Sequence, residues 1–279
     1  DNNIDAVLEL DYALSQALNL QLGLARKTRS PTHIERYLWL PLEVSAGLAD
    51  FNNYVGNIDL DPEVAHKLDL GLAWGSAGTY ARPRVFYSDI DDFIAGTPAT
   101  DTNVVTVSRA ATGDKTPQLF SNVGAEIYGF DLEWGARLAR HWRVDGTVSA
   151  VRGERDSGDD LFRMPADRAI TGLTYSGGTW SATVEAELVA KQSRISETLV
   201  LNENRSTNDD TAGYGLLYLS TQWRPTAGLN VVAGIDNVLD KSHVVHTNGF
   251  NRVQGSDVGF GERLPGTGRN VFVELGYQF

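Results

Sequence analysis

Apolar and polar side chains alternate along most of this chain with a period of two residues. In residues 67–74, for example, Leu68, Leu70 and Leu72 alternate with Asp69 and Gly71. Successive side chains of a β-strand point to opposite faces, so each such segment predicts a strand with one apolar and one polar face. The pattern predicts eleven strands, at residues 6–14, 18–25, 67–74, 79–95, 128–138, 142–152, 166–176, 180–191, 212–224, 229–236 and 270–279.

The two faces of the clearest predicted strands differ sharply in charge. Their apolar faces carry no charged residue, whereas their opposite faces carry polar and small ones. A charge on a lipid-facing strand position costs about 2–4 kcal/mol at the bilayer midplane. The pattern therefore favours an all-β transmembrane antiparallel barrel over a soluble sandwich, with a polar lumen on the other face. The lumen-facing candidates are Asp69, Asp131, Glu133, Glu185 and Glu187.

The connections between the predicted strands alternate between short and long. Short turns such as Ser15-Gln16 and Arg140-His141 alternate with long connections at about 28–62, 96–116, 153–164, 195–210 and 240–266. Outer-membrane barrels have short periplasmic turns and long extracellular loops. We therefore expect an up-and-down barrel in a bacterial outer membrane, with the long loops outside the cell and the C-terminus on the periplasmic side.

Four of the six tryptophans flank short turns: Trp74, Trp142, Trp180 and Trp223. Amphipathic rings collect at membrane–water interfaces, so this placement predicts a periplasmic aromatic girdle. The alternative is ordinary hydrophobic packing near the ends of a sheet.

Composition removes several classes of function. A formal charge of −12 argues against nucleic acid as a partner. The absence of cysteine excludes disulfides and thiolate chemistry in this chain. No stretch approaches eighteen uncharged apolar residues, which excludes a membrane-spanning helix, but a spanning strand needs only about 9–11 alternating residues.

No catalytic constellation stands out, and we expect neither an enzyme nor a bound cofactor or metal. Glu185 and Glu187 share a face, but carboxylates in a wet lumen are more common than catalytic pairs. The long connections are the candidates for ligand binding, because loops of this length are usually functional. The candidate residues are His33, Glu35, Arg36, Tyr37 and Trp39 in the first long loop, and His243 and His246 in the last.

Several short motifs resemble the C-terminal barrel of TonB-dependent outer-membrane receptors, and they occur in the family's order. They are Arg29-Ser30-Pro31, the run Asn57, Leu60, Pro62 and Glu63, the strand from Asn122 to Asp131, Gly234–Asp240, and Gly268-Arg269 before a strand that ends at Phe279. Ile58 departs from the family's usual proline. The resemblance covers essentially residues 1–279 and implies the second half of a 22-stranded barrel, with the plug domain outside this chain.

The resemblance implies energy-coupled uptake of a scarce nutrient, with a ferric siderophore or other metal chelate as the usual cargo. It also implies contacts with the lipid bilayer and lipopolysaccharide, with the TonB complex through the plug region, and with a small-molecule ligand. Tyr277 and Phe279 are similar to the terminal signal read by the barrel-assembly machinery. The alternatives are a passive outer-membrane porin and, third, a soluble β-rich adhesin module.

Overall fold

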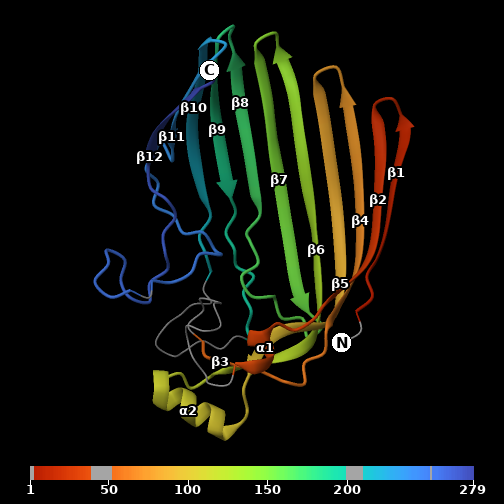
Figure 1. Cartoon of the computed structure of the whole chain (residues 1–279), viewed down its shortest axis with the longest axis vertical. Helices are drawn as coiled ribbons and strands as arrows, with labels where there is room; N and C mark the ends of the chain where they lie inside the picture. The colour runs from red at the N-terminus through yellow and green to blue at the C-terminus, as the bar shows by residue number, and fades with distance from the viewer. Residues whose placement is uncertain (1–2, 39–51, 199–209, 252) are drawn as a thin grey trace.

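The computed structural model describes residues 3–38, 52–198, 210–251 and 253–279. Within these ranges the chain forms one twelve-stranded sheet and two short helices (Figure 1). The strands are β1 (Ala6–Ser15), β2 (Leu18–Arg29), β3 (Tyr54–Val55), β4 (Glu63–Ser76), β5 (Thr79–Pro98), β6 (Gln118–Ala139), β7 (Trp142–Arg155), β8 (Arg168–Ser176), β9 (Trp180–Val189), β10 (Tyr214–Thr226), β11 (Leu229–Asp236) and β12 (Asn270–Tyr277).

Eleven of these strands follow one another across the sheet in chain order, and each pairs antiparallel with the next. This up-and-down arrangement confirms the predicted fold class and the eleven predicted strands. The twelfth strand, β3, lies off this path and pairs parallel with the start of β6. The sequence did not predict it, because two residues are too few to show an alternation.

Short turns and long loops lie at opposite ends of the sheet, as predicted (Figure 1). Several strands extend further toward the long loops than the alternation indicated: β4 begins at Glu63 instead of residue 67, and β6 at Gln118 instead of 128. At the same end, β8, β9 and β10 are each two residues shorter than predicted. Backbone pairing continues in the added parts of β4 and β6 although the apolar and polar faces no longer differ. The alternation of apolar and polar residues marks a strand only where its two faces differ. It therefore cannot mark the part of a strand whose two faces are alike.

The apolar face of the sheet is the exposed one. Leu70 of β4 is 42% exposed and Leu188 of β9 is 62% exposed. Their cross-strand partners continue the same face, as in the row Leu22, Leu70 and Val85. The apolar rows therefore do not converge on a shared dry interior, as they would in a sandwich.

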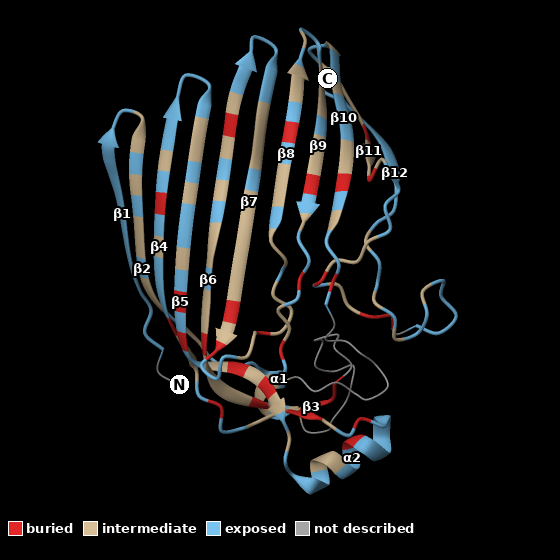
Figure 2. Ribbon diagram, turned by 180° about the vertical axis from the view of Figure 1, so that it is seen from behind, coloured by how far each residue is buried: buried red, intermediate tan, exposed pale blue. Residues whose placement is uncertain are grey.

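The described residues that form the hydrophobic core lie at the long-loop end instead (Figure 2). Tyr54, Leu60, Ile94 and Phe120 are buried together, and Leu38 packs against them. The rings of Tyr54 and Phe120 stack with their centroids 5.0 Å apart. This core joins the loop between β2 and β4 to the long-loop ends of β5 and β6.

Both helices lie in long loops, and neither was predicted. Helix α1 (His33–Tyr37) begins with a capping box between Thr32 and Glu35. Helix α2 (Thr102–Thr112) begins at Asp101, whose side chain accepts from the backbone N–H groups of Asn103 and Val104, and it ends at Gly113 with φ 84°. No helix in the described part of the chain is long and apolar enough to cross a membrane.

Candidate functional site

The acidic residues predicted to face the lumen lie on the face opposite the exposed apolar rows, and three of them form ion pairs. Arg82 donates to Glu133 at 3.0 Å, Arg84 donates through Nε to Asp69 at 3.1 Å, and Arg168 donates to Glu187 at 2.7 Å. Asp131 lies opposite Arg84 in the register of β5 and β6. Carboxylates and guanidinium groups thus alternate along this inner wall.

The arginines of the inner wall were missed by the sequence analysis. The turn between β4 and β5 is short, and it fixes a register that places Arg84 diagonally across from Asp69, so this pair could have been found. Arg82 and Glu133 come together across the long connection between β5 and β6, and no pattern sets that register in advance.

Glu187 is the most enclosed of the lumen-facing candidates. Its carboxylate accepts from Arg168 Nε and from the Tyr218 hydroxyl, each at 2.7 Å, and the residue is buried. It lines a cavity of about 400 Å³ between the last long loop and strands β9 to β11, where polar and apolar side chains are mixed. Tyr214, Asp236 and His243 also line this cavity.

A second cavity, of about 310 Å³, lies against the first and shares three lining residues with it: Glu187, Tyr214 and Val245. His246 lines only this second cavity, and His243 lines only the first. Glu187 thus borders both cavities.

Most candidates in the first long loop build the loop itself. Glu35 accepts from Arg29 Nη1 at 2.9 Å, and Arg29 Nε donates to Glu63 at 2.7 Å, so Arg29 ties α1 to β4. Arg36 donates to the Leu60 carbonyl at 2.9 Å. Burial raises the pKa of Glu35, but hydrogen bonds from Arg29 and Thr32 outweigh it and leave that pKa below its usual value.

The remaining candidates of this loop present aromatic rings. His33 and Tyr37 lie on one turn of α1, with ring centroids 5.0 Å apart, and Tyr37 is exposed. Trp39 lies outside the described residues.

The two histidines of the last loop are in different environments and do not form a joint site. His243 is half-buried and lies on Tyr214, with ring centroids 4.5 Å apart. His246 is buried, with Nδ1 2.8 Å from the Thr211 hydroxyl. Burial first, and then Arg263 and Arg163, lower the pKa of His246 to about 4. In the described residues no three His, Asp or Glu side chains gather closely enough to hold a metal ion.

His246 belongs to a group of polar contacts that joins three long loops. We call this group, formed by Gln192, Thr211, His246 and Arg263, the polar clasp. Arg263 donates to Thr211 and to the His246 carbonyl, which ties the last loop to the β9–β10 loop. Gln192 donates to the Met164 carbonyl at 2.9 Å, which adds the β7–β8 loop. The loops around Tyr54 form a separate block, in which Asn53 donates to Ser108 at 2.7 Å and to Asp114 at 2.9 Å. The sequence analysis found neither block.

The four predicted girdle tryptophans all lie on the exposed face at the short-turn end: Trp74, Trp142, Trp180 and Trp223. Trp180 pairs directly with Trp223 across β9 and β10. Tyr175, which the sequence analysis omitted, lies between Trp142 and Trp180, with centroid distances of 5.1 and 5.0 Å. Tyr277 and Phe279 are at the same end, with ring centroids 4.9 Å apart.

The geometry can be compared with known proteins. Residues 7–238 match the family model of the TonB dependent receptor-like β-barrel. The vitamin B12 transporter BtuB of Vibrio vulnificus (strain YJ016) is 24% identical over 230 residues, which make up 80% of this chain and 31% of that protein.

Solved structures show the same fold. The copper transporter OprC superposes with a TM-score of 0.82 at 24% identity, covering 100% of this chain and 40% of that one. The ferric enterobactin receptor PfeA of Pseudomonas aeruginosa superposes with a TM-score of 0.68 at 18% identity, covering 99% and 40%. This chain thus spans less than half the length of the relatives it matches. Because the family model covers most of it, the chain belongs to the TonB-dependent receptor family of outer-membrane β-barrels.

Proposed function

We propose that this chain is the second half of the barrel of a TonB-dependent transporter that takes up a scarce nutrient across the outer membrane. The observation that carries the proposal is the division of one family-typical sheet into two faces: an exposed face that is apolar and uncharged over its part nearer the short turns, and an inner wall that carries ion pairs. Lipid requires the first face, and a polar solute moving past a plug requires the second.

The proposed transporter contains more than this chain. β1 and β12 are the two ends of the strand order. Unpaired backbone groups at such edges are costly in lipid, so another set of strands is expected to pair with them. We propose a first barrel half and a plug domain encoded together with this half, with TonB acting on the plug. The long loops would be extracellular and the C-terminus periplasmic.

For the cargo we propose a ferric siderophore or another metal chelate. The named relatives transport or bind copper, ferric enterobactin and vitamin B12, and all of these ligands are scarce metals or metal complexes. The recognition surface we propose consists of the cavities beside Glu187, the exposed rings of His33 and Tyr37, and the half-buried ring of His243. Glu35, Arg36 and His246 would position the loops, because their side chains contact other parts of the same loops or of neighbouring ones.

On this proposal the inner wall is also the route of release. A pull on the plug would open a path beside Asp69, Asp131, Glu133, Glu185 and Glu187. Polar side chains are frequent along this wall, and Asp69, Glu133 and Glu187 are ion-paired, so a hydrated solute finds hydrogen-bonding partners along it. No covalent step is involved.

The test is uptake by the full-length protein in a Gram-negative host that lacks its own receptors for the chosen chelate. We expect accumulation of radiolabelled ferric chelates that requires both TonB and the proton-motive force, and we expect no steady ion conductance in planar bilayers. Uptake that is unchanged without TonB, together with open-channel conductance, would instead establish a passive porin. A protein that stays monomeric in detergent-free buffer would establish a soluble adhesin.

A further inference from the structure

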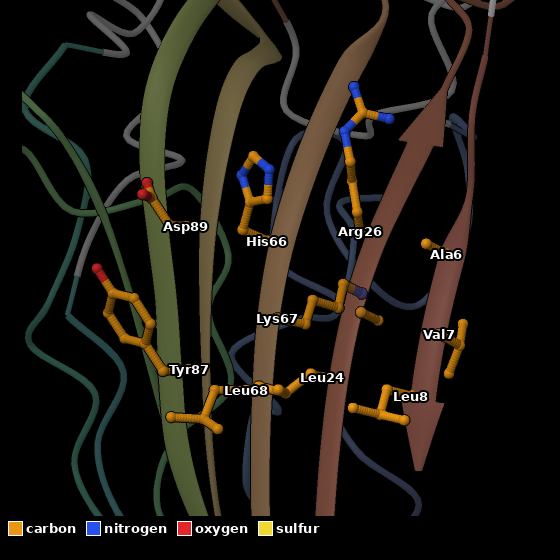
Figure 3. Close-up of a pocket in the computed structure, with 11 residues that line it drawn as sticks. Ala6, Val7, Leu8, Leu24, Arg26, His66, Lys67, Leu68, Tyr87 and Asp89 are labelled. Carbon is orange, nitrogen blue, oxygen red and sulfur yellow. The ribbon is translucent and has the colours of Figure 1, made fainter.

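The two faces of the sheet carry cavities of different chemistry. On the exposed face a groove of about 610 Å³ lies over β1, β2, β4 and β5, and Leu8, Leu24 and Leu68 are among the residues that line it (Figure 3). The proposed bilayer accounts for a groove of this kind. On the inner wall, the cavity of about 400 Å³ beside Glu187 combines aromatic rings with carboxylates. This mixture points to a ligand group with an apolar part and a charged end.

Two tyrosines and a histidine form walls of the inner cavity. Tyr214 and Tyr218 come from the inner face of β10, and both are half-buried. The His243 ring, which lies on Tyr214, has its Nδ1 3.1 Å from the Lys241 carbonyl. Gly266 leaves the space that this ring occupies, because a Cβ at that position would overlap His243 Nε2. The aromatic walls are therefore held in place by the last loop and β10.

The charged side chains that line this cavity are carboxylates. Among the described lining residues are Glu187 and Asp236, but no lysine or arginine. Arg168, which lines the neighbouring cavity, balances the charge of Glu187. Asp236 accepts from the neutral Asn270 amide at 3.1 Å and has no cationic partner in the described part of the chain. The negative charge of Asp236 is thus left uncompensated beside the cavity.

This arrangement suits an organic cation better than a metal ion or an anion. No three His, Asp or Glu side chains in the described residues gather closely enough to hold a metal ion. An anionic group would meet Asp236 and Glu187 without a lysine or arginine in the same lining. A primary ammonium group has three N–H donors for carboxylate oxygens, and tyrosine rings attract cations and pack against the attached carbon chain.

We propose that this cavity binds a primary ammonium group at the end of an aliphatic arm of the cargo. The ammonium would donate to Asp236 and Glu187, whose oxygens have lone pairs left for further hydrogen bonds. The arm would lie against Tyr214 and Tyr218, with the metal-binding part of the cargo outside the cavity. The inference rests on the proposed function, and it narrows the proposed cargo to a metal chelate with a cationic amine arm.

The test is calorimetric titration of the full-length receptor with two ferric chelates of one linear trihydroxamate. One chelate has a free terminal primary amine, and in the other this amine is acetylated and neutral. The amine form should bind at least about tenfold more tightly, because hydrogen bonds to charged groups contribute more than neutral ones. Asp236→Asn should remove most of this preference by weakening the binding of the amine form alone.

Glu274→Gln is the matched control. Glu274 is a carboxylate of the inner wall in β12, opposite Val232, and it does not line the cavity. The variant removes the same charge as Asp236→Asn and should keep the preference for the amine form. Heat-modifiable migration in gels checks that each variant has folded.

Three results would overturn the proposal: equal affinity of the unaltered receptor for the two chelates, no binding of the amine form, or a preference that persists in Asp236→Asn. If Asp236→Asn does not fold, the comparison of the two chelates on the unaltered receptor decides the question. TonB-dependent uptake of both chelates with equal affinity would reject this inference and leave the proposed function standing. Tight binding of the amine form without TonB-dependent uptake would reject the proposed function and leave the charge preference of the cavity standing.

Discussion

The direction in which each side chain points decides what it contacts in this sheet. Leu70 and Asp69 are neighbours in β4, yet Leu70 is exposed on the apolar face and Asp69 is paired with Arg84 on the inner wall. An outward charge meets hydrocarbon, whereas an inward charge meets water and counter-charges. Adjacent positions should therefore respond oppositely to the same substitution.

Leu70→Arg in the full-length receptor should reduce stability by about 2–4 kcal/mol, because it places a charge in the hydrocarbon region. Gln21→Arg is the matched control, since Gln21 pairs with Gly71 on the inner face and lies near Asp69. Urea unfolding in lipid vesicles measures both variants. Equal losses of stability in the two variants would contradict the assignment of faces.

His246 shows how burial of one side chain makes a loop sensitive to pH. Its pKa is about 4 in the folded loop, against 6.5 for an ordinary histidine. The folded loop thus binds fewer protons than the unfolded loop between these values. The stability that neutral His246 gives the clasp is fully present above pH 6.5 and is lost as the pH falls toward 4.

We predict that hydrogen-exchange protection of residues 237–269 declines as the pH is lowered from 6.5 to 4, beyond the intrinsic pH dependence of exchange. His246→Gln should flatten this decline, because glutamine does not titrate. His243→Gln is the control, since His243 lies in the same loop but contacts Tyr214 outside the clasp. A decline that persists unchanged in His246→Gln would show that other groups drive it.

At the scale of elements, the strands were predictable and the loops were not. A strand with one face in lipid must alternate between apolar and polar residues, so the alternation shows which residues form the strand. The short turns then fix the pairing of neighbouring strands into hairpins. Helix α1 has five residues and β3 has two, which is too short for any period to show. The predicted loop residues included Glu35 and His246 but not their partners Arg29 and Thr211. Thr211 and His246 are 35 residues apart in the chain, and Arg29 meets Glu35 only because the chain turns into α1 after β2, which no alternation predicts.

The core around Tyr54 and Phe120 is what holds the first two long loops together. Phe120→Ala should destabilise this block by about 3 kcal/mol through lost burial and the cavity left behind. The effect should be confined to the loops, because the strands are held together by their own backbone hydrogen bonds. Local hydrogen exchange in 52–62 and 99–117 should increase, while exchange in β8 to β10 should not.

Val107→Ala is the comparison for that experiment, because Val107 is exposed on α2 and its truncation should change stability by less than about 0.5 kcal/mol. Faster exchange throughout the sheet in Phe120→Ala would mean that the loop core and the barrel wall unfold as one unit.

The whole molecule is a sheet with its apolar side outward and its buried core at one end. This arrangement is stable only where something other than water covers the apolar rows, since an exposed apolar surface of this extent is unfavourable in water. The strand order also has two ends, β1 and β12. The closed barrel in a bilayer that we propose, with this chain as one half, accounts for both features.

The most direct test of this account is a spin-label scan of β4 in the full-length receptor reconstituted in a bilayer. Because this chain contains no cysteine, single cysteines can be introduced in turn at positions 67 to 72. Labels at positions 68, 70 and 72 should collide with dissolved oxygen, which concentrates in lipid, and labels at 67, 69 and 71 should collide with a water-soluble nickel complex. Oxygen accessibility that lacks this period of two, or that follows it with the opposite phase, would contradict the account.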